Sequence, residues 1–267
     1  MLRVPKASQN MLFGIPIAAY LLFLLVPMVG LLYRALSSES LSTVIRSSIL
    51  TDAIRVSLIT SLLAVGVTIL AGTPLAYFLA RRSFPGKSIV DVLIDLHLVL
   101  PPVVAGLALL MAFGRKGILG GALDSVGISL PFTTAAVVMA QVFVGAPFYV
   151  RAAKAGFDSV DQTLENISLA LGASQFRTFI KVTVPLAMPS LIAGTILSWA
   201  RAMSEFGATL IFAGNFQGST QTFSLAIVSS SEVDLAIALV LSGILLVLSF
   251  LFLLVIAKLS RKTGWTA

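Results

Sequence analysis

An arginine and a glutamate interrupt a long apolar segment in the C-terminal third of this sequence. Arg201 and Glu205 lie one helical turn apart within the run from Leu186 to Ala213. A charge inside an apolar helix is costly, and it normally faces protein or a water-filled cavity. The spacing also lets the two groups neutralise each other. The pair is therefore either part of a polar path through the protein or an ion pair that fixes this helix to a neighbour.

Other polar residues continue the line of this pair along the predicted helix. At about 100° per residue, an arc of about 120° contains Thr195, Ser198, Arg201, Glu205 and Thr209. An anchoring role is slightly favoured for the charged pair alone, whereas a pore-lining role is favoured for the whole face. In the pore interpretation Arg201 lowers the barrier for an anion, and the path includes Ser198, Arg201, Glu205, Gly207 and Thr209.

Two adjacent prolines interrupt another apolar segment, Ile89–Gly114. Pro101 and Pro102 lack amide donors, so they predict a kink in the middle of that helix. Kinked backbone at this depth is tolerated where it packs within protein or lines a cavity. We therefore include Pro101 and Pro102 in the predicted translocation path.

Three groups that can titrate lie nearer the start of the same segment. Asp91 and Asp95 are four residues apart, and His97 is close by. A proton relay is one interpretation. Anchoring of the two carboxylates to nearby basic residues is favoured, and the candidates are Arg81, Arg82 and Lys87.

The sequence contains no cysteine and one histidine. These counts exclude a disulfide framework, a thiolate metal site and a cysteine nucleophile, and they do not fit a histidine-rich metal site. Gly86-Lys87-Ser88 ends like a phosphate-binding loop, but the glycine expected five residues earlier is Arg81. We predict no catalytic residue, no metal site, no cofactor and no nucleotide binding by this chain.

The elements that position these residues are long and apolar. Hydrophobic residues make up 58% of the 267 residues and charged residues 11%, whereas a soluble domain has about a quarter charged residues. A hydrocarbon core of roughly 30 Å needs about 20 helical residues. Six stretches are long enough: Leu12–Leu36, Ala53–Ala80, Ile89–Gly114, Pro131–Gly156, Leu186–Ala213 and Leu235–Lys258. We predict an all-α integral membrane protein with about six transmembrane helices in one domain, 1–267.

Lysine and arginine residues concentrate on one side of these spans, and such loops are normally cytoplasmic. This side holds Arg3, Lys6, Arg81, Arg82, Lys87, Arg151, Lys154, Arg177, Lys181, Lys258, Arg261 and Lys262. The other side holds Arg34, Arg46, Arg115 and Lys116. Both termini are therefore predicted to be cytoplasmic, in the plasma or inner membrane. The net charge of +7 is explained by topology and does not require nucleic acid as a partner.

The connection between the fourth and fifth spans, 157–185, is long and is predicted to be helical. Ser159 and Gln162 fit a capping box, and an apolar stripe follows at helical spacing: Val160, Leu164, Ile167 and Leu171. Gly172 suits a left-handed helix end, Ser174 can cap a second helix, and Pro185 is expected to end it. The segment is either an amphipathic hairpin on the membrane surface or a docking element for a cytoplasmic partner.

The residues of this connection resemble the EAA loop of ABC importer permeases. That pattern is E-A-A, three residues, glycine, nine residues and I-x-L-P. Gly172 matches the glycine, and Val182, Val184 and Pro185 match the ending. Asn166, Ile167 and Ser168 occupy the E-A-A positions, with Glu165 one position earlier. The resemblance implies coupling helices that sit in a cleft of an ATPase subunit and that use Glu165, Asn166, Ser168, Gly172, Ala173 and Pro185.

Further stretches resemble the molybdate, tungstate and sulfate permeases of this family. They are Gly72–Tyr77, Phe84–Ser88, Leu100–Gly106 and Trp199–Thr209, and Phe113–Gly117 is similar to the molybdate branch. The resemblance implies an ABC importer permease fold that moves a tetrahedral oxyanion, molybdate or tungstate ahead of sulfate, by alternating access. It also implies a second permease copy, two ATPase subunits and an extracytoplasmic substrate-binding protein, with no enzymatic activity in this chain.

Two alternatives remain open. Within the same family, the chain could be a sulfate or thiosulfate permease, because discrimination between oxyanions would lie largely in the binding protein. From another class, it could be an ion-coupled secondary transporter, which predicts an internal repeat of the spans and discontinuous helices. No clear repeat is visible, and that class does not explain the long helical connection. A membrane-embedded enzyme is a distant third.

Overall fold

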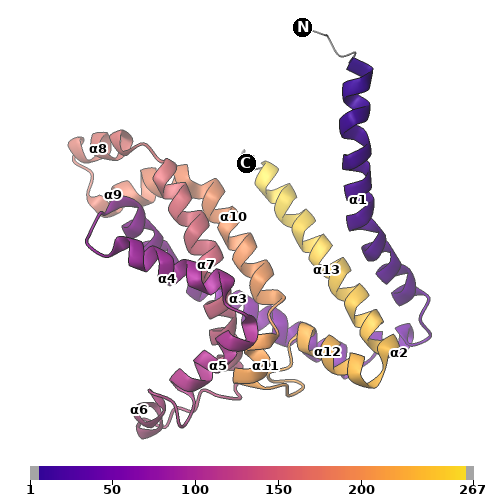
Figure 1. The fold of residues 1–267 in the computed structure, drawn as a ribbon. Coiled ribbons are helices and arrows are strands. Elements are labelled where there is room, and N and C mark those ends of the chain that lie inside the picture. Colours follow the sequence, from indigo (N-terminus) through magenta and orange to yellow (C-terminus); the bar gives the residue numbers. More distant parts are fainter. Residues whose placement is uncertain (1–5, 263–267) are drawn as a thin grey trace. The chain divides into compact units, whose positions relative to one another are not determined.

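The structure, a computed structural model, describes residues 6–262, so Arg3 of the basic side lies outside the described residues. Figure 1 shows helices throughout, and no strand occurs in the described part of the chain. The all-α prediction is therefore confirmed. The long helices are α1 (Lys6–Leu36), α3 (Ser48–Arg81), α7 (Thr134–Ser159), α10 (Val184–Met203) and α13 (Leu235–Lys262). The shorter ones are α2 (Leu41–Ile45), α4 (Lys87–Val99), α5 (Pro102–Phe113), α6 (Gly120–Ser125), α8 (Gln162–Ala170), α9 (Gln175–Thr178), α11 (Gly207–Ala213) and α12 (Phe223–Val233).

The chain divides into two compact units. The first comprises Met1–Leu50 with Ile227–Val255, and the second comprises Thr51–Ala226 with Ile256–Ala267. In the first unit, α1 and α13 come close where Gly243 faces Ala35, because a Cβ on Gly243 would lie 2.6 Å from the Ala35 Cβ. The second unit contains all the predicted site residues.

Five helices are long and apolar enough to cross a membrane, and a sixth span results if α4 and α5 are counted together. This confirms the expectation of about six spans. The α4–α5 pair is bent by 118°, and the break falls at Leu100 and Pro101, as the two adjacent prolines predict. Because proline lacks an amide hydrogen, the first turn of α5 is a position where Pro102 costs no hydrogen bond.

The predicted span Leu186–Ala213 is wrong as a single helix. Helix α10 ends at Met203, and α11 begins at Gly207. The Glu205 carboxylate accepts a hydrogen bond of 2.7 Å from the backbone amide of Ala208, so it caps the start of α11 instead of continuing α10. Thr209 therefore lies beyond a helix break and does not share one continuous helical face with Ser198.

The second unit is built around α7. Figure 1 shows α7 and α10 side by side, and small residues allow the close approach: a Cβ on Gly194 would lie 2.8 Å from the Ala152 Cβ. Such contacts are typical of helices packed within membranes. One apolar core joins α5, α7 and α11 and contains Ala105, Leu109, Ala136, Val137, Ala140, Val144, Ala208, Phe212 and Ala213. The other joins α3, α7 and α10 and contains Ala76, Tyr149, Val150, Ala153, Phe157, Val160, Ala187 and Leu191.

Helices α5 and α11 cross at two glycines. A Cβ on Gly106 would lie 2.9 Å from the Ala208 Cα, and a Cβ on Gly207 would lie 2.8 Å from the Pro102 Cβ. At both positions a side chain larger than hydrogen would clash with the opposite helix. The contact holds the two short helices against each other beside their breaks.

We predict that Gly106→Ala lowers thermal stability, because the new methyl group meets backbone of α11 that cannot rotate away. The expected cost is about 1–3 kcal/mol, the range for overpacked cores, read as a lower Tm of the purified protein in detergent. Gly66→Ala in α3 is the matched control, since no atom lies within 4 Å of its Cβ position. An unchanged Tm in Gly106→Ala would contradict this contact.

Candidate functional site

The connection between α7 and α10 is helical, as the sequence predicted. It consists of α8, α9 and a π-helical segment, Phe179–Thr183, that runs directly into α10. The predicted capping box at Ser159 is wrong. Ser159 is the last residue of α7 and its hydroxyl donates to the Gly156 carbonyl over 2.7 Å. Asp161 caps α8 instead, and its carboxylate accepts a hydrogen bond of 2.8 Å from the Thr163 amide.

The turn between α8 and α9 has the conformation that the sequence predicted. Gly172 has a φ of +89°, which is left-handed and favours glycine. Its amide donates to the Leu169 carbonyl over 2.9 Å, and the Ala173 amide donates to the Ser168 carbonyl over 3.1 Å. This is the hydrogen-bond pattern of a Schellman helix end. The predicted cap of α9 is also confirmed, since the Ser174 hydroxyl accepts from the Arg177 amide over 3.2 Å.

Pro185 does not end a helix, contrary to the prediction. Helical structure runs without a gap from Gln175 to Met203, and Pro185 occupies the first turn of α10. Proline cannot donate to a carbonyl of the preceding turn, and this loss is tolerated where a new helical segment begins. The change from π to α geometry occurs at Val184, whose amide donates to the Phe179 carbonyl.

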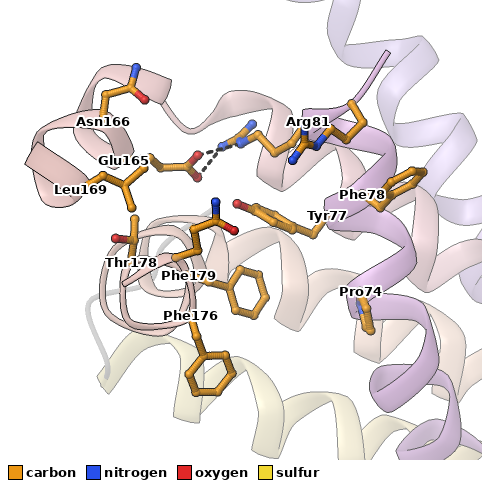
Figure 2. Close-up of a pocket in the computed structure, with 12 residues that line it drawn as sticks. Pro74, Tyr77, Phe78, Arg81, Glu165, Asn166, Leu169, Phe176, Thr178 and Phe179 are labelled. Atoms are coloured by element: carbon orange, nitrogen blue, oxygen red, sulfur yellow. Dashed lines mark hydrogen bonds and ion pairs between the residues drawn. The ribbon is translucent and has the colours of Figure 1, made fainter. Parts of the chain in front are cut away.

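Glu165 is the single buried residue of α8, with 8% of its surface exposed. Its carboxylate forms an ion pair with the Arg81 guanidinium at the end of α3, with N–O distances of 2.8 and 3.0 Å. The Thr183 hydroxyl donates to the same carboxylate over 2.6 Å. Figure 2 shows the Glu165 and Arg81 side chains pointing toward each other across a pocket. Glu165, which lies one position before the glutamate expected in the motif, therefore binds residues of this chain.

The Arg81 guanidinium also binds the end of α7. It donates to the Phe157 carbonyl over 2.7 Å and to the Val160 carbonyl over 3.3 Å. With Glu165 these acceptors use both sides of the planar guanidinium fork, a geometry that lysine cannot reproduce. Arg81 and Thr183 were not among the predicted site residues. The signal for Arg81 was its place among the basic residues that follow the second span.

Burial raises the pKa of the Glu165 carboxyl, but the hydrogen bonds from Arg81 and Thr183 and the charge of Arg81 outweigh it, so the net pKa is lowered. A carboxyl whose pKa is lowered on folding stabilises the folded state above its unfolded pKa of about 4.3. That contribution is lost as the pH falls through the lowered value. The ion pair is therefore fully formed at neutral pH.

The apolar stripe predicted along this connection is divided between two surroundings. Val160 is buried in the core between α3, α7 and α10. Leu164, Ile167 and Leu171 are instead 45%, 52% and 84% exposed. With Gly172 and Ala173 they line a groove of about 530 Å³. Helix α8 therefore buries its carboxylate and exposes apolar side chains, the reverse of a helix that packs its apolar face against its own domain.

Some residues of the predicted path do come together at the two helix breaks. Pro102 contacts Gly207, and Glu205 caps α11 beside them. The Arg201 guanidinium lies 3.8 Å from the Glu205 carboxylate, beyond hydrogen-bond distance, and its side chain is 34% exposed.

The uncharged polar residues of the predicted path are buried. Ser198 and Thr209 are 1% and 0% exposed. Gln141 of α7, which sequence reasoning missed, is 1% exposed, and its amide has no hydrogen-bond partner among the described residues. Its signal was a polar residue inside the apolar run Pro131–Gly156.

Asp91 and Asp95 are anchored, but not to Arg81, Arg82 or Lys87. Arg151 of α7 forms ion pairs with both carboxylates and donates to the Asp91 backbone carbonyl over 2.8 Å. The predicted partners were chosen by nearness in sequence, whereas Arg151 is supplied by a neighbouring helix. Among the described residues, no group of three or more His, Cys, Asp or Glu side chains could hold a metal ion.

These features define a multi-pass membrane protein in which helix α8 lies between two candidate spans, Thr134–Ser159 and Gln175–Met203. Residues 72–264 match the family described as "Binding-protein-dependent transport system inner membrane component". Because the match covers more than half of the chain, the chain belongs to this family. It is a membrane component of a transport system and not a catalytic subunit.

Several named relatives are similar over most of the chain. The probable transport system permease protein NifC of Clostridium pasteurianum is 37% identical over 90% of this chain and 84% of the relative. The molybdenum transport system permease protein ModB of Escherichia coli K12 is 38% identical over 80% of this chain and 98% of the relative. The molybdate/tungstate transport system permease protein WtpB of Thermococcus kodakarensis is 41% identical over 68% of both chains.

A solved structure has the same fold. A chain of the bacterial alginate ABC transporter, crystallised with an alginate pentasaccharide-bound periplasmic protein, superposes with a TM-score of 0.78. The match covers 96% of each chain at 15% sequence identity. At this identity the likeness concerns the fold alone.

We predict that Gly172→Val loosens the turn between α8 and α9. Nothing lies within 4 Å of a Cβ at Gly172, so the cost arises from the left-handed backbone and should be about 1–2 kcal/mol. Limited proteolysis of the purified protein should cleave this turn at least fivefold faster. Gly121→Val is the control, because Gly121 also has open space but no left-handed φ. Equal cleavage rates in wild type and Gly172→Val would show that the turn does not need glycine.

Proposed function

We propose that this chain is the membrane-spanning permease subunit of an ATP-driven ABC importer, and that its substrate is molybdate or tungstate ahead of sulfate. Family membership supports the transport role, and the names of the ModB and WtpB relatives support the substrate. The observation that carries the subunit assignment is the helical connection 157–185, in which α8 exposes an apolar face outside the predicted spans.

Helix α8 is the proposed docking element for the ATPase. Exposed apolar patches on proteins usually mark interaction sites, and Leu164, Ile167 and Leu171 form such a patch beside Gly172 and Ala173. Asn166 is exposed and available to a partner, whereas Glu165 is occupied by Arg81. Among the coupling residues inferred from the motif, Glu165 then supports α8 from within, and Ser168 supports it through a 2.9 Å hydrogen bond to Thr178. Pro185 lies in the first turn of α10 and is exposed.

The proposed assembly contains two copies of this permease domain, 1–267, two ATPase subunits and an extracytoplasmic binding protein. Both termini and the connection 157–185 face the cytoplasm in this proposal, as the distribution of basic loops indicates. ATP is hydrolysed by the separate subunits. Gly86-Lys87-Ser88 follows helix α3 and opens helix α4, which is not the strand-to-helix setting of a phosphate-binding loop.

The proposed translocation path runs past the two helix breaks, where Pro101, Pro102, Glu205 and Gly207 lie. Arg201 is the charged group best placed to meet an anion, because its side chain is partly exposed and only loosely held by Glu205. Ser198 and Thr209 are buried in this conformation, so alternating access would have to uncover them.

Reconstitution tests this proposal. The permease, its ATPase and its binding protein in proteoliposomes should take up molybdate or tungstate only when ATP is present inside. The permease alone should hydrolyse no ATP. Excess sulfate should compete weakly if the substrate assignment holds. ATP-independent uptake by the permease alone would overturn the importer assignment and favour an ion-coupled transporter.

Two matched substitutions test the docking surface within the same experiment. Ile167→Asp places a charge on the exposed face of α8, so it should reduce co-purification of the ATPase at least tenfold. Ile118→Asp is the control, because Ile118 is 89% exposed between α5 and α6, away from α8. Equal loss in both variants would point to general damage, and no loss in Ile167→Asp would remove α8 as the docking element.

The roles of Arg201 and Glu205 can be separated by three variants: Arg201→Ala, Glu205→Gln and the double change. Gln at position 205 retains an acceptor for the Ala208 amide, so α11 keeps its cap while the charge is removed. A structural ion pair predicts that the double variant is tolerated better than the single changes. We expect that outcome for assembly, whereas uptake should remain at least tenfold reduced in both variants that lack Arg201. Wild-type uptake by the double variant would reduce the pair to an anchor.

A further inference from the structure

Helix α8 is joined to the rest of its unit by few buried contacts. Its apolar residues Leu164 and Ile167 are exposed, and Glu165 is its one buried residue. Ser168 adds one hydrogen bond, to Thr178 of α9, which continues through the π-helical segment into α10. A force applied to α8 therefore reaches the long helices through the Glu165 carboxylate, the Ser168–Thr178 hydrogen bond and the chain ends, and the Glu165 carboxylate is the buried contact among them.

A single guanidinium binds that carboxylate and joins the ends of α3 and α7, and Thr183 connects the same carboxylate to the start of α10. Arg81 is the last residue of α3. It binds Glu165 of α8, and it donates to the carbonyls of Phe157 and Val160 where α7 ends. Thr183, which binds Glu165 from the other side, immediately precedes α10. We call Arg81, Glu165, Thr183 and the two α7 carbonyls the Arg81 cluster.

The space beside this cluster is not filled by side chains. A pocket of about 770 Å³ lies between α3 and the α8–α9 turn, and its walls include Tyr77, Phe78, Leu169 and Phe176. In Figure 2 the Arg81–Glu165 pair spans this pocket. Tyr77 of α3 packs against Phe179 of the π-helical segment, with ring centroids 4.8 Å apart, but the polar link from α3 to α8 itself among the described residues is the Arg81–Glu165 ion pair.

We propose that Arg81 is a positioning residue that makes α8 and the adjoining ends of α3, α7 and α10 move as one body. Without it, α8 would swing about the residues 160–161 and the Gly172 turn. The displacement caused by a docked ATPase would then be absorbed by the connection instead of reaching the translocation path. This inference rests on the proposed function, since it assigns a role in transmitting ATPase movement.

The first test measures the rigidity of the permease alone. The sequence has no cysteine, so Ala155→Cys in α7 and Ala170→Cys in α8, both at exposed positions, provide two unique spin-label sites. Arg81→Ala should at least double the width of the label-to-label distance distribution measured by pulsed EPR. Glu165→Gln and Thr183→Val should widen it less, which keeps the test usable if Arg81→Ala fails to fold.

The second test measures transmission in the complete complex with ATPase and binding protein. Arg81→Ala and Glu165→Gln should retain the co-purified ATPase within twofold, while molybdate imported per ATP hydrolysed falls at least tenfold. Lys154→Ala is the matched control, because its ion pair with Asp158 over 3.3 Å stays within α7. This variant should remain within twofold of wild type on both measures.

The outcomes separate the two proposals. An unchanged EPR width in Arg81→Ala and Glu165→Gln overturns the role of the Arg81 cluster, whatever the protein transports. A wider distribution with unchanged import per ATP shows that the cluster orders α8 without transmitting movement, which also overturns the proposal. If the wild-type complex imports no oxyanion, the proposed function fails, while the EPR result still decides whether the cluster fixes α8.

Discussion

Backbone groups inside a bilayer have no water to bind, and this constraint decides where the helices of this chain can break. The two breaks within its apolar segments satisfy it in different ways. At Leu100–Pro101 the amide donors are removed by proline, and at Ser204–Phe206 the Glu205 carboxylate accepts the Ala208 amide. Gly207 and Pro102 bring the two breaks together. Glu205, a charged residue within an apolar segment, thus accepts the hydrogen bond of a backbone amide that the helix break would otherwise leave without a partner.

This use of Glu205 changes the meaning of its pairing with Arg201. One carboxylate oxygen is committed to Ala208 at 2.7 Å, while Arg201 remains 3.8 Å from the other. The glutamate is fixed and fully buried, whereas the arginine is loosely held and partly exposed. A cation whose counter-charge is present but not in contact can exchange partners at lower cost than one in a tight buried pair. The asymmetry favours Arg201 as the member of the pair that an anion would meet.

Local signals in the sequence predicted most of the elements, whereas the errors came from two sources: local capping at Ser159, Pro185 and Glu205, and contacts between distant residues. Hydropathy located the spans because each depends only on its own composition, and Gly172 and Ser174 marked a turn whose hydrogen bonds lie within a few residues. The helix break after Met203 is stabilised by the Glu205 carboxylate, which the sequence alone indicated as the ion-pair partner of Arg201. The anchoring of Asp91 and Asp95 depends on Arg151, which lies on another helix. Neither distance along the chain nor periodicity carries that information.

The site shows the same division between local pattern and tertiary contact. The apolar stripe from Leu164 to Leu171 has helical spacing, and spacing alone suggests a face turned toward the core. The structure instead turns Glu165 inward, because Arg81 and Thr183 together compensate the carboxylate for the water it loses. Once the carboxylate is bound there, helix geometry leaves Leu164, Ile167 and Leu171 pointing outward. Arg81, at the end of a helix more than eighty residues away, therefore supplies the positive charge that holds the Glu165 carboxylate in this inward position.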